Sequence, residues 1–271
     1  MRKLRIKTIP KKESEGLYKV FTNQHLKIYN DIKKNIEISS VQEWFKYCPP
    51  AQGKKQWVDK RSAKEMAKFW TDIHKQNDFL LFMKKIKKEL ILNYAFPEMA
   101  TAFDENGSPR KNDLCVFATD RNKEILIAIE GKADESFGVN VDKEWIESIP
   151  EKIRNNKSKK IDRIIGLYQR FDNNANFLKL KYQLIYWLAG AIDEAERRQI
   201  ETVFLIVQEF HSEKTEEKKI NLNKSDLDLF VNIISNSVLK KVNKNEIVGP
   251  IKNQFTKQLN LYVGKYQTYI K

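Results

Sequence analysis

Three charged residues in the middle of the chain have the types and the spacing of a metal-dependent hydrolytic site. Asp113 opens one apolar segment, and Glu130 and Lys132 close the next one with a single residue between them. Because side chains alternate along a strand, Glu130 and Lys132 are expected on the same face of a sheet. If the two segments are neighbouring strands, Asp113 can converge on that pair. We therefore predict an oxygen-rich pocket at Asp113 and Glu130 that suits Mg²⁺, for which Mn²⁺ can substitute.

Lys132 would lie beside this metal. A lysine there can orient or activate an attacking water and stabilise the negative charge that builds on phosphorus during hydrolysis. The competing explanation is a structural ion pair of Lys132 with Asp113 or Glu130. We favour the hydrolytic site because Glu130 and Lys132 interrupt an apolar run. Charged side chains are costly to bury there unless they are paired or bound to a metal.

The segments around these residues have the patterning of an antiparallel meander followed by a helix and a buried strand. Polar turn clusters separate three β-rich segments. A long segment after them repeats apolar residues every three or four positions, which is typical of a helix packed on a sheet. The nearly continuous apolar run that follows is typical of a central strand buried on both faces. The expected strands are 99–103, 114–119, 125–132 and 202–208, and the long helix is expected at about 176–198.

Further elements are expected on both sides of this core. Ser40 with Glu43, and Ser62 with Glu65, have the spacing of reciprocal capping pairs, so a helix is predicted to begin at each serine. The remaining expected elements are an edge strand within 1–15, a helix at about 78–91, a helix at 225–240 and a strand within 251–271.

The acid followed by Glu-x-Lys resembles the PD-(D/E)xK phosphodiesterase superfamily, which has the restriction-endonuclease-like fold. The resemblance covers about 78–208 in the order of its elements, and 129–138 is similar to a segment of little-characterised bacterial proteins of this fold. It implies that Asp113 and Glu130 bind a divalent metal while Lys132 assists hydrolysis. The sequence departs from the pattern at Asn112, where the superfamily has proline, and at Gly131, where the residue is usually apolar.

The resemblance also points to three neighbours of the site. Gln183 lies on the long predicted helix, as in the Gln-plus-aromatic motif of the RecB-type branch, with Trp187 four residues later in the aromatic position. Such nucleases often take a further acid from the preceding helix or the first strand. Glu98 and Glu65 are candidates for that acid, although the capping pair with Ser62 already explains Glu65.

Composition favours a protein that binds a polyanion. The chain has 50 Lys and Arg against 36 Asp and Glu, which gives a formal net charge of +14. Nucleic acid is therefore the expected partner, with DNA the expected kind. No apolar run approaches the roughly 18 residues of a membrane-spanning helix, so no membrane partner is expected. Only two cysteines are present and no early segment reads as a signal peptide, which indicates a cytoplasmic location.

We thus predict one domain over 1–271 of the α/β class, with a mixed central sheet flanked by helices. Its restriction-endonuclease-like core spans about 78–210, with additions at 1–77 and 211–271. The predicted function is a magnesium-dependent endonuclease, and a homodimer is compatible with it. The alternatives are a nuclease-fold module that binds nucleic acid or regulates without cutting, and a protein-interaction factor whose positive charge serves solubility.

Overall fold

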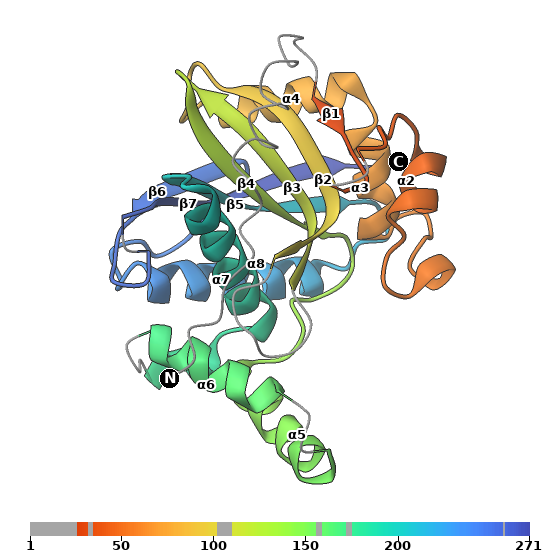
Figure 1. The fold of residues 1–271 in the computed structure, drawn as a ribbon. Coiled ribbons are helices and arrows are strands. Elements are labelled where there is room, and N and C mark those ends of the chain that lie inside the picture. Colours follow the sequence, from red (N-terminus) through yellow and green to blue (C-terminus); the bar gives the residue numbers. More distant parts are fainter. Residues whose placement is uncertain (1–25, 32–34, 102–109, 156–158, 172–174, 257) are drawn as a thin grey trace.

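The computed structural model describes residues 26–31, 35–101, 110–155, 159–171, 175–256 and 258–271. In these ranges the chain is a mixed α/β protein built on one seven-stranded sheet with helices on both faces (Figure 1). The strands are β1 (Lys27–Ile28), β2 (Ile91–Thr101), β3 (Arg110–Asp120), β4 (Lys123–Lys132), β5 (Thr202–His211), β6 (Glu246–Ile251) and β7 (Asn260–Tyr269).

The sheet has the strand order β1-β2-β3-β4-β5-β7-β6. Strands β2, β3 and β4 form an antiparallel meander, and β5 joins β4 in parallel. Strand β7 then pairs with β5 in parallel, while the short strands β1 and β6 lie at the two edges. The predicted mixed sheet, its meander and its central apolar strand are confirmed, and so is the C-terminal strand.

Helices cover both faces of the sheet, and each face has its own core. The helices are α2 (Val41–Tyr47), α3 (Ser62–Trp70), α4 (Ile73–Met83), α5 (Val141–Arg154), α6 (Lys160–Arg170), α7 (Tyr182–Arg198) and α8 (Glu217–Ile234), with the 3₁₀ turns η1 (Gly53–Lys55) and η2 (Ala175–Lys179). On one face α7 and α8 bury Trp187 and Phe230. On the other, α2, α3 and α4 bury Trp44, Trp70 and Phe79.

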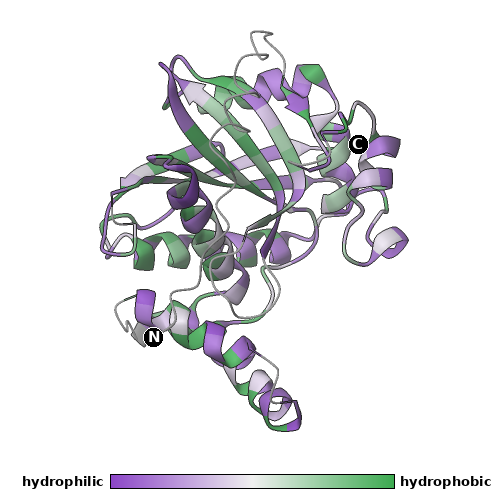
Figure 2. Ribbon diagram, viewed as in Figure 1, coloured by the Kyte–Doolittle hydropathy of each residue, from purple (hydrophilic) through white to green (hydrophobic). Residues whose placement is uncertain are grey.

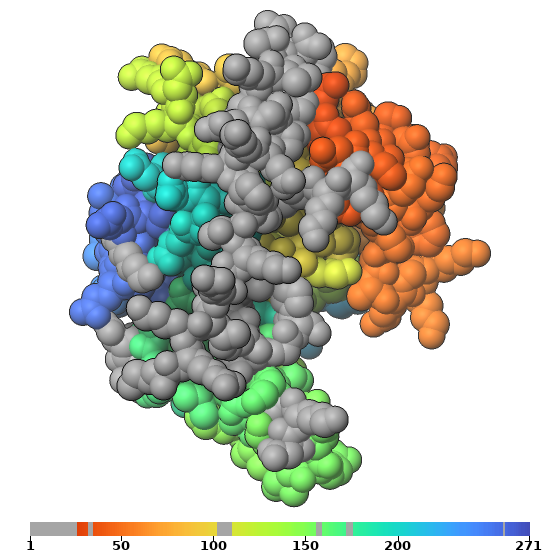
Figure 3. Space-filling model, viewed as in Figure 1, coloured from red at the N-terminus to blue at the C-terminus, as the bar shows by residue number. Residues whose placement is uncertain are grey.

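The figures show where apolar residues gather and where the molecule extends. Apolar residues are concentrated along the strands of the sheet (Figure 2). Helices α5 and α6 lie at one end and extend away from the sheet, and the space-filling view shows the same extension (Figures 1 and 3). None of the helices within the described ranges is long and apolar enough to span a bilayer.

Several predicted boundaries were wrong. The expected helix at 78–91 is instead α4, which ends at Met83, and β2 begins at Ile91 rather than at residue 99. The apolar residues from Leu90 onward fit helical spacing and strand patterning equally well, and pairing with β3 decides for the strand. Helix α8 also begins and ends earlier than 225–240. The edge strand expected within 1–15, and the polar segment 104–109 where the sequence predicts a turn between the first two strands, lie outside the described residues.

Candidate active site

The sheet places three carboxylates at neighbouring positions on three adjacent strands. In the pairing of β2 with β3, Pro97 is opposite Leu114 and Met99 is opposite Asn112, so Glu98 falls opposite Asp113. Between β3 and β4 the last registered pair at this end is Leu114 with Ile129, and Asp113 and Glu130 are the next positions. Asp113 therefore stands between Glu98 and Glu130.

Asp113 is held at the point where β3 and β4 separate. Its Oδ2 atom accepts a hydrogen bond of 2.8 Å from the Gly131 backbone N–H. Burial and then the negative charge of Glu130 raise the pKa of Asp113 to about 8, although Lys132 and Arg110 act in the opposite direction. The structure thus places Asp113 within electrostatic range of Glu130 and Lys132, but its hydrogen bond is to the Gly131 backbone, and the convergence of the three side chains stays a prediction.

Glu130, Lys132 and Gln183 form one hydrogen-bonded group. The Lys132 Nζ atom lies 3.1 Å from Glu130 Oε1 and 3.1 Å from Gln183 Oε1. The Gln183 side-chain amide also donates to Glu130 Oε1. Lys132 and Glu130 lie on one face of β4, while Gln183 reaches them from the first turn of α7. Gln183 is therefore a direct neighbour of the predicted catalytic pair.

The aromatic residue expected beside Gln183 lies elsewhere. Trp187 is fully buried in the core between α7 and the sheet. Tyr186, one position earlier, is only partly buried, and its ring lies 4.8 Å from the guanidinium of Arg163. The helical turn that presents Gln183 to Lys132 thus directs Trp187 inward.

Arg110 is a member of the site that the sequence reading missed. Its guanidinium Nη2 donates to Glu130 Oε2, and both side chains are largely buried. The Arg110 Nε atom is also buried but has no hydrogen-bond partner. Arg110 is the first residue of β3, and only its position three residues before Asp113 in the same strand could have suggested its proximity.

The two further acids have different surroundings. Burial raises the pKa of Glu98, and the charge of Glu130 adds to this while Lys111 and Arg110 oppose it. Glu98 is therefore part of the carboxylate row. Glu65 is not: its Oε1 accepts from the Lys60 backbone N–H at 2.9 Å and from Lys68 Nζ at 2.8 Å. Those contacts hold Glu65 at the start of α3, and it does not line the cavity beside Asp113.

The sequence departs from the PD-(D/E)xK pattern at Asn112 and Gly131, and the structure shows what surrounds each of these residues. Asn112 replaces the proline of the PD-(D/E)xK pattern, and its buried amide donates to Thr101 Oγ1 at 3.1 Å, which ties β3 to β2. At Gly131 a Cβ atom would lie 2.9 Å from Met66 Cγ. A side chain at the middle position would therefore require the Met66 side chain of α3 to shift.

The residues present fit a divalent cation held with water and substrate oxygens. Among the described side chains, no three His, Cys, Asp or Glu residues are grouped as ligands of one metal ion. Asp113 and Glu98 are half-buried, however, and desolvation followed by the charge of Glu130 raises the pKa of both; a cation would relieve that repulsion. Two carboxylates with several waters is a common magnesium environment.

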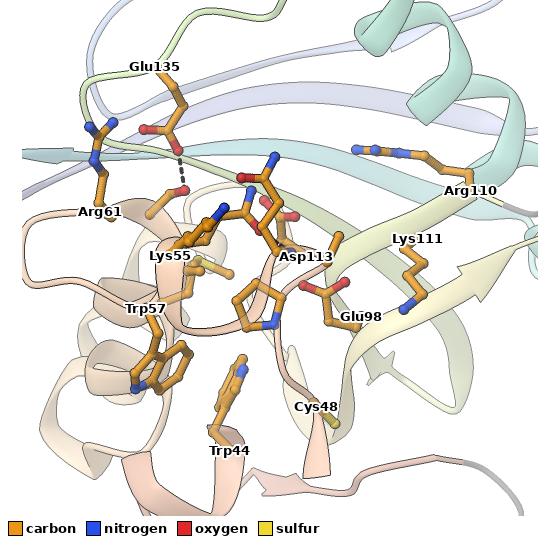
Figure 4. A pocket seen from close by; sticks show the side chains of 17 residues that line it. Trp44, Cys48, Lys55, Trp57, Arg61, Glu98, Arg110, Lys111, Asp113 and Glu135 are labelled. Carbon is orange, nitrogen blue, oxygen red and sulfur yellow. Dashed lines mark hydrogen bonds between the residues drawn. The ribbon is translucent and has the colours of Figure 1, made fainter. Parts of the chain in front are cut away.

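A cavity of about 470 Å³ opens beside Glu98 and Asp113, whereas Glu130, Lys132 and Gln183 do not line it (Figure 4). Glu98 and Asp113 line it from the sheet, and residues of α2, α3 and the segment between them form the opposite wall. Two contacts fix this layer to the turn after Lys132. Arg61 Nη1 lies 2.7 Å from Asp134 Oδ1, and the Ser62 hydroxyl donates to Glu135. Ser62 thus contacts Glu135 instead of capping α3, whereas Ser40 caps α2 as predicted.

Comparison with known proteins identified one family. Searches of curated proteins and of solved structures found no match to this chain. The profile of a family described as "Domain of unknown function (DUF6946)" matches residues 37–269. That range includes the whole sheet except β1, every described helix and all the residues of the site. The chain therefore belongs to the DUF6946 family.

Proposed function

We propose that this protein is a divalent-metal-dependent nuclease that hydrolyses phosphodiester bonds in nucleic acid, with DNA as the expected substrate. The proposal includes a restriction-endonuclease-like core of the PD-(D/E)xK type. The main support is the group formed by Glu130, Lys132 and Gln183 beside Asp113. The acid and the Glu-x-Lys come from adjacent antiparallel strands, as the resemblance requires, and α7 adds the glutamine.

In this proposal Asp113 and Glu130 hold Mg²⁺ or Mn²⁺, and Glu98 is close enough to share the charge. The bound ion would polarise the scissile phosphate and lower the pKa of an attacking water. Lys132 would place that water and stabilise the charge on the phosphate, because its ammonium is fixed between Glu130 and Gln183. Gln183 positions the lysine and has no direct role in the reaction.

The charge of the chain supports a nucleic-acid substrate. The formal net charge is +14, and the wall of the cavity that faces Asp113 carries Lys55 and Arg61. Binding through phosphates weakens steeply with salt because each neutralised phosphate releases counterions. The cytoplasmic location predicted from the sequence belongs to the same proposal.

A cleavage assay with near-isosteric variants tests the proposal. The purified protein is incubated with plasmid, single-stranded DNA and RNA, in Mg²⁺ or in EDTA. We expect cleavage only with the metal, and expect Asp113→Asn, Glu130→Gln and Lys132→Met each to abolish it. The exposed acid Glu89 supplies the matched control, since Glu89→Gln should cleave normally. Full activity in all three site variants would exclude the assignment.

A nuclease-fold module that binds nucleic acid without cutting is the second candidate, and Arg110 favours it. Its guanidinium already neutralises Glu130, so a metal at that acid must compete with a buried ion pair. Calorimetric titration with Mg²⁺ and Mn²⁺ separates the two candidates. Heat of binding that disappears in Asp113→Asn supports the nuclease, whereas salt-sensitive DNA binding with no metal binding supports the module.

A further inference from the structure

Three chemical kinds of side chain line the cavity beside Asp113. Trp44 and Trp57 line it on the side of the N-terminal helices, and Lys55 and Lys111 stand at its margin. Figure 4 shows the two tryptophans on one side of the pocket and Asp113 with Glu98 on the side of the sheet. Aromatic, cationic and carboxylate groups thus surround one space.

The aromatic wall is braced by neighbouring residues. Trp44 is buried in the core under α2, and the ring of Trp57 is braced by Phe45 with their centroids 4.9 Å apart. The segment between them is also held in place, since the Gly53 backbone N–H donates to Pro50 at 2.8 Å. A fixed aromatic face beside a hydrolytic site is suited to stacking with a nucleobase, because every base has a π-face.

Two exposed lysines stand where phosphates could bind. Among the described residues, no carboxylate lies within ion-pair distance of Lys55 or Lys111, although Lys111 acts on the nearby charge of Glu98. Both lysines are exposed. A backbone phosphate on either side of a stacked base would find an exposed ammonium group there.

The size of the cavity limits what can enter. A volume of about 470 Å³ falls within the range of roughly 300–1,000 Å³ typical of pockets for small molecules. A nucleotide fits such a space, but a duplex does not. Enzymes that act in pockets of this kind use single-stranded substrates or extrude a nucleotide from the duplex.

We infer that this cavity binds one unpaired nucleotide of a single strand, with its base against Trp57 and its phosphates at Lys55 and Lys111. The inference rests on the proposed function and specifies its substrate as single-stranded or locally opened nucleic acid. Trp57 and Lys55 both belong to the segment that precedes α3, so the N-terminal helical layer carries the substrate specificity.

The test measures binding in EDTA, where no cleavage occurs. A fluorescein-labelled oligodeoxynucleotide and the matching blunt duplex are titrated with the protein, and fluorescence anisotropy is recorded. We expect the single strand to bind more tightly than the duplex. Trp57→Ala should weaken single-strand binding on the order of tenfold, whereas Trp57→Phe should retain most of the affinity because it keeps an aromatic face.

Lys55 and the neighbouring Lys54 provide a matched pair of variants. Lys55→Ala should weaken binding and lower the salt dependence by about one phosphate contact. The neighbouring Lys54 is exposed but does not line the cavity, so Lys54→Ala should change neither. Thermal melting identifies any variant that is unfolded. If Trp57→Ala is unfolded, the affinity of Trp57→Phe is compared with that of the wild type instead.

The outcomes separate this inference from the proposed function. Equal binding of duplex and single strand, or unchanged binding in Trp57→Ala, would overturn the pocket assignment even if magnesium-dependent cleavage is observed. Loss of cleavage without loss of strand binding in Asp113→Asn leaves the pocket assignment intact. Absence of cleavage in the wild-type protein would reject the nuclease, and preferential binding of the strand would still support the pocket.

Discussion

Lys132 and Gln183 lie within hydrogen-bonding distance although 51 positions separate them in the sequence. Gln183 accepts from the lysine through Oε1 and donates to Glu130 through its amide nitrogen. One side chain of α7 therefore bridges the two charged residues of β4. This arrangement fixes the lysine ammonium against the strand instead of leaving it free in the cavity.

The first prediction concerns this bridge. Gln183→Ala should lower the turnover number about 10- to 100-fold, a range typical of residues that orient others at a metal site. The affinity for Mg²⁺ should change less, because Asp113 and Glu130 remain. Single-turnover cleavage and metal titration measure the two effects. Gln169 is an exposed glutamine of α6, so Gln169→Ala is the control. Unchanged turnover in Gln183→Ala would show that the lysine needs no bridge.

The second prediction concerns the stability of the metal-free protein at different pH. Burial and the charge of Glu130 raise the pKa of Asp113 to about 8, above its ordinary value of 3.8. Between these values the folded protein binds more protons than the unfolded chain, so the free energy of unfolding falls as the pH rises. The free energy of unfolding should therefore decrease as the pH rises from about 4 to about 8.

Urea unfolding in EDTA from pH 5 to pH 8.5 checks this expectation. Asp113→Asn still accepts from the Gly131 N–H through its amide oxygen but does not titrate, so its stability should vary less with pH than that of the wild type. Divalent metal should counteract the loss in the wild type only, because binding favours the charged carboxylate. Parallel pH profiles for the two proteins would contradict the raised pKa.

The sequence alone was sufficient to place the site residues that lie on regular strands. Glu130 and Lys132 interrupt an apolar run, and the alternation of side chains correctly placed both on one face of β4. The order of meander, helix and buried strand followed from periodicity, because long segments with a consistent pattern have only one way to bury their apolar side chains.

Other members of the site depended on tertiary contacts. Nothing in the local sequence distinguishes Glu98 from Glu65. Only the register of β2 with β3 brings Glu98 opposite Asp113, whereas Glu65 accepts hydrogen bonds from Lys60 and Lys68. Arg110 was missed because its partner lies on the neighbouring strand, 20 positions away. The cavity was missed as well, since it exists only where the N-terminal helices pack near the sheet.

The third prediction concerns the close packing at Gly131. A side chain at this position would displace Met66, because a Cβ atom would lie 2.9 Å from Met66 Cγ and 3.2 Å from its sulfur. Gly131→Ala should therefore lower the free energy of unfolding by about 1–3 kcal/mol, the usual cost of overpacking. Urea denaturation measures it. In a Met66→Ala background the same change should cost less, which a double-mutant cycle would detect.

Gly166 provides the control for that experiment. It lies in α6, and a Cβ atom there would meet nothing within 4 Å. Gly166→Ala should be neutral or stabilising, since alanine favours a helix over glycine by about 1 kcal/mol. Equal destabilisation by the two substitutions would mean that contact with Met66 is not the cause.

The fourth prediction concerns a buried ion pair between β5 and β7, in which Glu209 is the register partner of Lys132 on β4. Lys265 Nζ on β7 lies 2.8 Å from Glu209 Oε1 on β5, and neither side chain is more than about 6% exposed. Glu209 also faces His211, whose Nε2 lies 2.9 Å from Oε2. Removal of the lysine alone leaves a buried carboxylate with a reduced set of partners, so Lys265→Met should destabilise the protein by about 3–5 kcal/mol.

The double variant Lys265→Met/Glu209→Gln separates the charge from the packing. It removes both charges and should recover part of the lost stability, because a buried ion pair replaced as a unit is far less costly than one broken on a single side. Lys252 is exposed and has no ion-pair partner among the described residues, so Lys252→Met should have little effect. If the double variant is less stable than Lys265→Met, the loss in the single variant comes from packing at Lys265 and not from the unpaired carboxylate of Glu209.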